Sequence, residues 1–209
     1  MEGSVAHARK KELRQQIRSN REALPADHSA RLDLNTQVSA LIQLVMREGA
    51  HPNILAYASI AHEPSIDDAL DHARVDGARV FLPVVTAPGE PLMFGEVTSP
   101  LRDLTPVGKW GIREPHPTMG PEQLIGDLGL ALIPGLSFST QGGRLGNGGG
   151  FYDRTFGPQG VAPLGEVSRG GTLLSVGVCF DSEYGAEFPI APWDLTVDGV
   201  VTENGLHMV

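Results

Sequence analysis

Cysteine and long apolar segments are scarce in this chain of 209 residues. Cys179 is the only cysteine, so the chain cannot form an intramolecular disulfide, which fits a reducing compartment. No segment reaches the roughly 18 consecutive apolar residues of a membrane-spanning helix, and the first residues lack the apolar core of a signal peptide. We therefore expect a cytoplasmic protein that does not bind a membrane.

Positive charge is also in short supply. The chain has 16 Lys and Arg residues against 25 Asp and Glu, and its net charge is -9. A chain with no overall positive field is poorly suited to collect the phosphates of a nucleic acid, so we expect no nucleic-acid partner. The length suits one domain with a sizeable core.

Several catalytic signatures are absent. The chain contains no Gly-x-x-x-x-Gly-Lys-Ser/Thr loop, no His-Glu-x-x-His zinc motif and no Gly-x-Ser-x-Gly nucleophile elbow. Cys179 stands among apolar residues of a predicted strand and is better explained as part of the core than as a nucleophile. These absences disfavour a Walker-type nucleotidase, a zinc hydrolase and a serine hydrolase of the common type.

Apolar runs with strand character alternate with helical patterns along the chain. The apolar spacing predicts helices over Arg9–Leu24, Ser29–Glu48 and Ser65–Ala73. It predicts strands over Asn53–Ser59, Arg79–Val85, Pro91–Val97, Leu128–Pro134, Thr172–Phe180 and Val197–Thr202. This alternation indicates an α/β domain with a mostly parallel sheet, in which ligands bind at the carboxyl ends of the strands.

The chain shows one domain and two irregular segments. We expect residues 1–8, which are small and polar, to form a flexible N-terminus, and residues 9–209 to form the domain. The segment Gly157–Gly171 is rich in glycine and proline and is predicted to be a mobile excursion.

The most informative feature is a glycine-rich run that follows the predicted strand Leu128–Pro134. Six of the nine residues from Gly142 to Gly150 are glycine. Ordering so many glycines costs conformational entropy, and their usual purpose is to let the backbone approach a ligand closely. Successive N–H groups in such a run can form a nest for phosphate oxygens, and a helix beginning near Phe151 would add further N–H groups.

A glycine run can also be a surface loop without a ligand, and this alternative stays open. The four residues that follow the run favour a functional interpretation; they are Phe151, Tyr152, Asp153 and Arg154. Two aromatic rings can stack on a flat ligand, and a carboxylate can hold a metal ion beside a bound phosphate.

A basic helix is the second unusual feature. Six of the sixteen cations of this acidic chain lie between Arg9 and Arg21. Helical spacing places Lys10, Arg14 and Arg21 along one edge of the apolar stripe. They can form a solvated face, or the docked helix can bring Lys10 and Arg14 to an anion, where cations stabilise phosphoryl charge.

Two carboxylates in other parts of the chain are further candidates. Glu63 follows a predicted strand, and a carboxylate there can accept hydrogen bonds from an amino-substituted heterocycle. Asp194 can be a turn residue, or it can share a magnesium ion with Asp153, because Mg²⁺ often uses one or two carboxylates together with substrate phosphates.

Taken together, these residues resemble the 5-formyltetrahydrofolate cyclo-ligase family over about residues 9–204. The most specific part is Gly146-x-Gly148-x-Gly150 followed by Phe-Tyr-Asp-Arg. The order and spacing of the fragments carry the resemblance. The other fragments are Lys10-x-x-Leu13-Arg14, Tyr57 leading to Glu63, the hexapeptide Trp110–Pro115, the heptapeptide Leu132–Phe138 and Asp194-x-x-x-Asp198.

The resemblance implies a three-layer α/β/α sandwich related to the ribose-5-phosphate isomerase and CoA-transferase folds. It implies a ligase of one-carbon folate metabolism that uses ATP and Mg²⁺ to convert 5-formyltetrahydrofolate to 5,10-methenyltetrahydrofolate, releasing ADP and phosphate. The small-molecule partners would be a reduced folate and ATP, and we expect a monomer.

The resemblance also implies roles for individual positions. Lys10, Arg14 and Arg144 would be catalytic and would contact the nucleotide, and Asp153 and Asp194 would hold Mg²⁺. ATP would further contact Leu145, Gly146, Asn147, Gly148, Gly149, Gly150, Phe151 and Tyr152. The folate would contact Ala58, Glu63, Trp110, Gly148, Gly149, Gly150 and Phe151.

Three positions depart from the family pattern. Asn147 stands where a basic residue or tyrosine is common, Gly149 where some members have lysine, and Trp193 where histidine is frequent. A lost cation near phosphate weakens charge stabilisation. An alternative is therefore a catalytically weak paralogue that binds folate or nucleotide. A different enzyme on the sugar-phosphate isomerase fold is a third possibility, but it leaves the paired aspartates unexplained.

Overall fold

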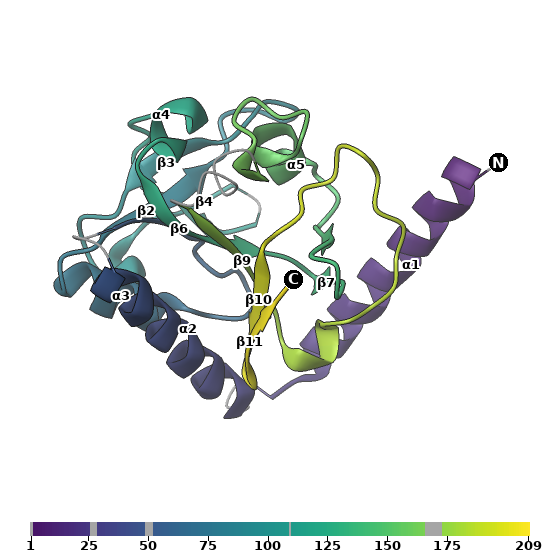
Figure 1. Cartoon of the computed structure of the whole chain (residues 1–209), viewed down its shortest axis with the longest axis horizontal. Coiled ribbons are helices and arrows are strands. Elements are labelled where there is room, and N and C mark those ends of the chain that lie inside the picture. The colour runs from purple at the N-terminus through teal and green to yellow at the C-terminus, as the bar shows by residue number, and fades with distance from the viewer. Residues whose placement is uncertain (1, 26–28, 49–51, 109, 166–172) are drawn as a thin grey trace.

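A mixed sheet forms the centre of the molecule. The computed structural model describes residues 2–25, 29–48, 52–108, 110–165 and 173–209 (Figure 1). Its seven-stranded sheet has the order β11-β10-β9-β6-β1-β2-β3. The five inner strands run parallel, and the two edge strands, β3 and β11, run antiparallel to their neighbours. The prediction of an α/β fold with a mostly parallel sheet is confirmed.

The strands of this sheet are β1 (Asn53–Leu55), β2 (Arg79–Val84), β3 (Met93–Glu96), β6 (Leu128–Pro134), β9 (Leu174–Val178), β10 (Gly199–Thr202) and β11 (Gly205–Met208). Two small hairpins lie outside it, formed by β4 (Pro106–Val107) with β5 (Ile112–Arg113) and by β7 (Ser137–Phe138) with β8 (Arg144–Leu145). The helices are α1 (Glu2–Ala23), α2 (Ser29–Glu48), α3 (Asp67–Val75), α4 (Pro121–Ile125) and α5 (Phe151–Phe156), with 3₁₀ turns η1 (Leu101–Asp103) and η2 (Asp181–Glu183).

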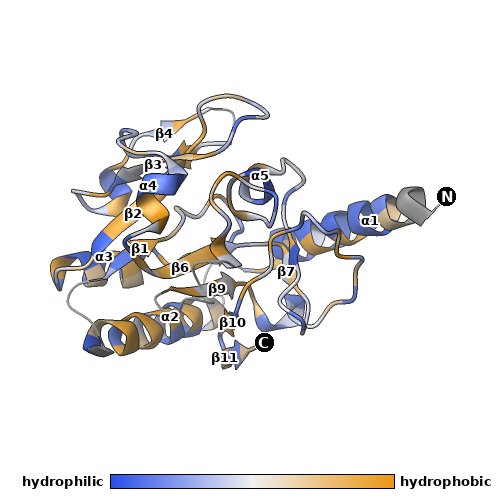
Figure 2. Cartoon of the chain, turned by 45° about the horizontal axis from the view of Figure 1, so that its top comes forward, coloured by the Kyte–Doolittle hydropathy of each residue, from blue (hydrophilic) through white to orange (hydrophobic). Residues whose placement is uncertain are grey.

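Helices cover both faces of the sheet and produce three layers. On one face, apolar residues of α2 and α3 pack on the sheet, with Leu34, Leu70 and Leu130 fully buried among them. On the other face, α4 and α5 pack on side chains such as Phe81 and Ile133. Figure 2 shows the apolar strands between these layers. Cys179 is buried in the second cluster, as expected for a core residue.

Several element boundaries differ from the sequence expectations. The helix Ser29–Glu48 and the strand Leu128–Pro134 are confirmed at both ends. The strand predicted over Asn53–Ser59 ends at Leu55, although the backbone N–H of Ala56 still donates to the carbonyl oxygen of Phe81 in β2. The other shared elements differ by a few residues, and residue 172, predicted to begin a strand, lies outside the described residues.

The first helix begins earlier than the apolar pattern indicated. It starts at Glu2 instead of Arg9, and its N-terminal end projects from the body of the molecule (Figures 1 and 2). Helical structure therefore extends into residues 2–8, and the division into a flexible N-terminus and a domain over 9–209 stays a prediction. In the predicted mobile excursion, residues 166–171 lie outside the described residues.

The first helix packs on the loops beyond the sheet, not on a face of the sheet. Leu13 and Ile17 are buried against Leu136, Leu145 and Phe188. This cluster joins α1 to the segment that follows β6 and to the β7–β8 hairpin. The apolar stripe of the basic helix therefore buries itself beside the glycine-rich segment.

A buried ion pair fixes the second half of α1. Arg21 and Glu183 are only 3% and 6% exposed, and the Arg21 guanidinium donates to both carboxylate oxygens, at 2.6 and 2.8 Å. The same guanidinium donates to the carbonyl oxygen of Gly135 at 2.8 Å. Burial alone would lower the pKa of Arg21, but the hydrogen bond and charge of Glu183 raise it above its ordinary value. Arg21 is therefore a structural cation and not part of an exposed basic face.

We predict that Arg21→Ala lowers the free energy of unfolding by about 3–5 kcal/mol, because it leaves the Glu183 carboxylate buried without its cation. Chemical denaturation followed by circular dichroism measures this change. Arg9→Ala, which removes the exposed pair with Glu12 on the same helix, should change stability by less than about 0.5 kcal/mol. Equal effects of the two substitutions would contradict the anchoring role of Arg21.

Candidate functional site

The loops after β1, β6 and β9 surround the candidate site. These strands are neighbours and run parallel, so their carboxyl ends lie at one edge of the sheet. The glycine-rich loop, residues 146–150, follows β8 and leads directly into α5. Gly148 and Gly150 have φ angles of +101° and +69°, which residues other than glycine rarely adopt. The predicted helix start near Phe151 is confirmed.

Arg144 lies buried beneath this loop. It is 7% exposed, and its guanidinium carbon stands 4.8 Å from the centre of the Tyr152 ring. Gly146 leaves room for it: a Cβ at that position would stand 2.2 Å from a terminal nitrogen of Arg144. Burial lowers the pKa of Arg144, whereas the charges of Asp153 and Asp194 oppose that change. The site thus contains a desolvated cation held against an aromatic face.

Polar atoms without partners gather in this segment. In the described part of the chain, six buried side-chain polar atoms have no hydrogen-bond partner. Three of them are Arg144 Nε, Tyr152 Oη and Arg154 Nε. Native proteins rarely leave such groups unpaired, so their concentration within eleven consecutive positions points to a ligand that would satisfy them.

The basic helix α1 contributes three side chains to the site. Arg14 Nε donates to the carbonyl oxygen of Gly146 at 2.8 Å, and an Arg18 nitrogen donates to that of Asn147 at 2.9 Å. Lys10 forms an ion pair with Asp194, although 184 positions separate them in the chain. The structure therefore supports the predicted docking of Lys10 and Arg14 and adds Arg18 to them.

Excess positive charge surrounds the loop. Arg154 stacks its guanidinium 5.2 Å from the centre of the Phe151 ring and donates to the carbonyl oxygen of Gly149 at 2.7 Å. Within the described residues, four guanidinium groups at the loop have no ion-pair partner; they belong to Arg14, Arg18, Arg144 and Arg154. In an acidic protein, uncompensated cations concentrated at one loop form an anion-binding environment.

Asp153 and Asp194 meet at the same short segment. The backbone N–H of Leu195, next to Asp194, donates to Asp153 at 3.1 Å, and that of Ala191 donates to Asp194 at 2.8 Å. No group of three or more His, Cys, Asp or Glu side chains suited to a metal ion is found among the described residues. Both carboxylates thus contact the segment 191–195, and Mg²⁺ often uses one or two carboxylates together with water and substrate phosphate.

Glu63 also contacts the glycine-rich loop. It lies in the turn after β1, where its carboxylate accepts hydrogen bonds from the backbone N–H of Ile60 at 3.2 Å and from the Asn147 side chain at 3.4 Å. Burial raises the pKa of Glu63, and these hydrogen bonds oppose that change. His62, beside it, has a φ of +67°, so this turn carries backbone strain.

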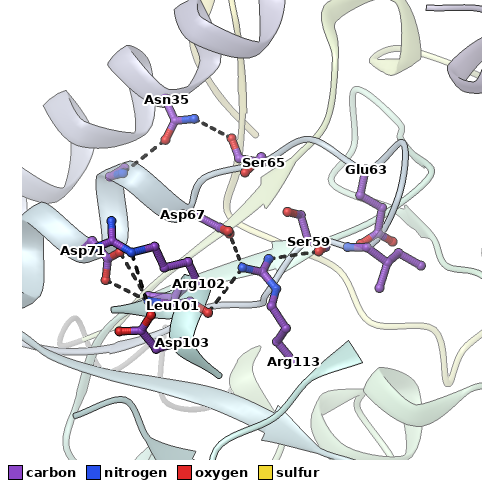
Figure 3. A network of polar contacts seen from close by, with 12 residues as sticks. Asn35, Ser59, Glu63, Ser65, Asp67, Asp71, Leu101, Arg102, Asp103 and Arg113 are labelled. Atoms are coloured by element: carbon purple, nitrogen blue, oxygen red, sulfur yellow. Dashed lines mark hydrogen bonds and ion pairs between the residues drawn. The ribbon is translucent and has the colours of Figure 1, made fainter. Parts of the chain in front are cut away.

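A polar network holds the segment that carries Glu63. Figure 3 shows Arg113 between Asp67 and Ser59, with Glu63 on the loop beyond them. Arg113 donates to the Asp67 carboxylate at 2.6 Å and to the carbonyl oxygen of Ser59 at 3.1 Å. Asn35 donates to the carbonyl oxygen of Ser65 at 2.7 Å. In the sequence, Arg113 stood out only as a member of the hexapeptide Trp110–Pro115. The structure shows that its hydrogen bonds fix the start of this loop.

Two predicted folate contacts are placed differently from Glu63. Ala58 lies beyond the end of β1, and its side chain is buried in the core beneath α2 and α3. A ligand would therefore meet its backbone rather than its methyl group. Trp110 lies in the turn between β4 and β5 with its side chain 66% exposed. The roles assigned to both residues stay predictions.

A cation-rich glycine loop beside two carboxylates, at the carboxyl ends of parallel strands, is typical of α/β enzymes that act on phosphorylated ligands. The chain matches the model of the 5-formyltetrahydrofolate cyclo-ligase family over residues 6–203. This protein belongs to that family.

Similar proteins agree with this assignment. The chain is 33% identical to the 5-formyltetrahydrofolate cyclo-ligase of Mycolicibacterium smegmatis over 154 residues, which cover 71% of this chain and 72% of the relative. It is 27% identical to the cyclo-ligase of Saccharomyces cerevisiae over 214 residues, which cover 95% and 97% of the two chains. The resemblance inferred from the sequence is confirmed.

Solved structures share the fold. The NMR structure of the 5,10-methenyltetrahydrofolate synthetase of Aquifex aeolicus matches with a TM-score of 0.68 at 25% identity, covering 95% of this chain and 92% of that one. A synthetase from Mycoplasma pneumoniae matches with a TM-score of 0.64 at 20% identity, covering 93% and 98%. The second likeness concerns the fold alone. The predicted relation to ribose-5-phosphate isomerase and CoA-transferase folds stays a prediction.

We predict that Gly146→Ala weakens the binding of inorganic triphosphate about tenfold, because the added methyl group displaces the Arg144 guanidinium and with it a charged hydrogen-bond donor. Isothermal titration calorimetry measures the Kd. Gly120→Ala is a matched control, because a Cβ at that position meets nothing within 4 Å. Unchanged binding in Gly146→Ala would argue against Arg144 as an anion-binding group.

Proposed function

We propose that this protein converts 5-formyltetrahydrofolate to 5,10-methenyltetrahydrofolate at the glycine-rich loop, with ATP cleaved to ADP and phosphate. The observation that carries the proposal is the set of guanidinium groups without ion-pair partners around residues 146–150, in a chain of the cyclo-ligase family. The comparisons do not favour a catalytically weak paralogue.

The reaction asks the protein mainly to align two substrates and neutralise charge. The formyl oxygen bonds to the γ-phosphorus while the bond to ADP breaks. N10 of the folate then bonds to the formyl carbon, loses its proton, and the carbon–oxygen bond to phosphate breaks. No protein nucleophile is needed, which agrees with the burial of Cys179.

The nucleotide subsite is assigned to α1 and the loop. Lys10, Arg14 and Arg144 supply positive charge where the transferred phosphoryl group carries its negative charge. The backbone from Arg144 to Tyr152 wraps the triphosphate. The positive φ angles of Gly148 and Gly150 turn the backbone sharply there without side chains in the way.

The divalent-ion subsite is assigned to Asp153 and Asp194. When bound, Mg²⁺ would neutralise phosphate charge and orient the phosphoryl group for attack. Leu195 and Ala191 hold the two carboxylates through their backbone N–H groups, which limits the freedom of both side chains. Lys10 pairs with Asp194 in this structure and lies ready to contact a phosphate oxygen instead.

The folate subsite is assigned to the opposite side of the loop. Glu63 would accept hydrogen bonds from the amino-substituted ring of the folate, a role that suits an ionised carboxylate. Ala58, Trp110 and the run Gly148–Phe151 would complete the subsite.

The structure bears on two of the departures from the family pattern. Asn147 and Gly149 carry no cation, but Arg18 donates to the Asn147 carbonyl oxygen and Arg154 to that of Gly149. Cations from α1 and α5 therefore stand beside both positions, which supports an active enzyme. The third departure, Trp193, is more than half exposed, and nothing in the structure explains it.

The described residues contain no helix long and apolar enough to cross a membrane. The cytoplasmic location and the monomeric state expected from the sequence stay predictions.

The direct test is to mix the purified protein with 5-formyltetrahydrofolate, ATP and Mg²⁺ and to follow methenyl product by absorbance and ADP by a coupled assay. We expect the two products in equal amounts and no reaction without ATP. Tight binding of both substrates without product would overturn the proposed activity.

We predict that Asp153→Asn lowers kcat at least a hundredfold, because it removes a charged ligand from the proposed Mg²⁺ site while keeping the shape of the side chain. Steady-state kinetics at several Mg²⁺ concentrations measures the loss, and circular dichroism checks the fold. Asp127→Asn, at an exposed position just after the end of α4, is the matched control. Full activity in Asp153→Asn would refute the metal role.

A further inference from the structure

The side chain of Asn147 links two elements that the sequence keeps far apart. Its amide nitrogen donates to Glu63 Oε1 at 3.4 Å, and its amide oxygen accepts from an Arg18 nitrogen at 3.1 Å. The chain of contacts runs from α1, through the glycine-rich loop, to the turn after β1. Both the backbone carbonyl oxygen and the side chain of Asn147 take part in these contacts.

The chemistry of these groups determines the orientation of the amide. A guanidinium only donates hydrogen bonds, and an ionised carboxylate only accepts them. The amide oxygen must therefore face Arg18, and the amide NH₂ must face Glu63. Arg18 also donates to the backbone carbonyl oxygen of Asn147 at 2.9 Å, so the guanidinium forms two hydrogen bonds with this residue. This arrangement prevents the amide from turning over and presenting its oxygen to the carboxylate.

Glu63 depends on such donors because its surroundings disfavour a charge. Burial is the main cause that raises its pKa. Both of its oxygens accept a hydrogen bond from a neutral N–H group, one from the Ile60 backbone and one from the Asn147 side chain. The titratable and charged groups around it come from α1, the end of β1, η2 and α5; they are Arg18, Arg21, Tyr57, Glu183 and Tyr152.

Asn147 differs from these neighbours because its side chain donates a hydrogen bond to the carboxylate. The charge of Arg21 also lowers the pKa of Glu63, but its guanidinium donates its hydrogen bonds to Glu183 and to the carbonyl oxygen of Gly135. Burial raises the pKa values of Tyr57 and Tyr152, so both phenols stay neutral near pH 7. The hydroxyl of Tyr57 donates to the carbonyl oxygen of Pro64. Asn147 is thus a side-chain donor that contacts the Glu63 carboxylate directly.

We propose that Asn147, oriented by Arg18, is a positioning residue of the folate subsite that holds the Glu63 carboxylate in place as an acceptor for the amino-substituted ring of the substrate. This inference rests on the proposed function, in which Glu63 binds that ring. It assigns the Asn147 side chain to the folate and leaves the loop backbone to the triphosphate.

The first experiment measures the carboxylate directly and needs no turnover. The protein is labelled with ¹³C at the glutamate carboxyl carbon, the Glu63 signal is assigned with Glu63→Gln, and the signal is followed by NMR as pH changes. Asn147→Ala removes a donor from the charged form, so the Glu63 midpoint should move to higher pH. Arg18→Ala should move it in the same direction by a smaller amount, because the amide is then free to turn over.

The matched control is Asn20→Ala, an exposed asparagine on the same helix as Arg18, which should leave the midpoint unchanged. A Glu63 midpoint that stays in place in Asn147→Ala would overturn the inference. Arg18→Ala keeps the question decidable if Asn147→Ala does not fold, because an unmoved midpoint in that variant would also count against it.

The second experiment uses the reaction. As pH falls, protonation of Glu63 removes the acceptor, so kcat/KM for 5-formyltetrahydrofolate should fall on the acid side. In Asn147→Ala this acid limb should move to higher pH, with a loss of about tenfold at pH 6 and a smaller loss at pH 8. Asn147→Gln, which keeps the amide, should recover part of the loss. A loss that is equal at all pH values would indicate a merely structural role and contradict the inference.

The two experiments separate the two ideas. A wild-type protein that forms no product would refute the proposed function, whereas the NMR titration would still report whether Asn147 supports Glu63. A protein that forms product but shows no movement of the Glu63 midpoint would refute only the role of Asn147.

Discussion

The buried ion pair between Arg21 and Glu183 is the constraint on which the site depends. It fixes α1 against the loops that follow β6 and β9, and the apolar contacts of Leu13 and Ile17 align the rest of the helix. With that alignment, the cations of successive helical turns reach Asp194 and the carbonyl oxygens of the glycine-rich loop. Lys10, Arg14 and Arg18 each contact a different part of the site, so a rotation of α1 would misplace all three together.

The site contains buried polar groups whose desolvation is unfavourable unless a bound ligand pairs with them. Arg144 is desolvated without a carboxylate to pair with, and the hydroxyl of Tyr152 is buried without a partner. Both are expensive in an empty protein and useful when a charged ligand arrives, because no solvent shell then has to be removed from them. The positive φ angles of Gly148 and Gly150 likewise hold the loop backbone in a turn that no side chain blocks.

The sequence predicted the elements whose own residues determine them. The strand Leu128–Pro134 is a continuous apolar run with proline at its end, and Ser29–Glu48 repeats its apolar residues at helical spacing. It missed α4, β11 and the two hairpins, because they are short and take their shape from neighbouring elements. Among the candidate site residues, the structure brings together Lys10, Arg14, the glycine-rich loop, Asp153 and Asp194. The Arg21–Glu183 and Arg18–Asn147 contacts could not be predicted, since they join positions 162 and 129 residues apart only after folding.

The contact between Lys10 and Asp194 joins residues near opposite ends of the chain. During synthesis, the helix that carries Lys10 emerges from the ribosome 184 residues before its partner. A truncated translation product can therefore build most of the sheet and still lack a complete site. A chain that ends before Asp194 therefore lacks the partner of Lys10 and one of the two carboxylates proposed to hold Mg²⁺.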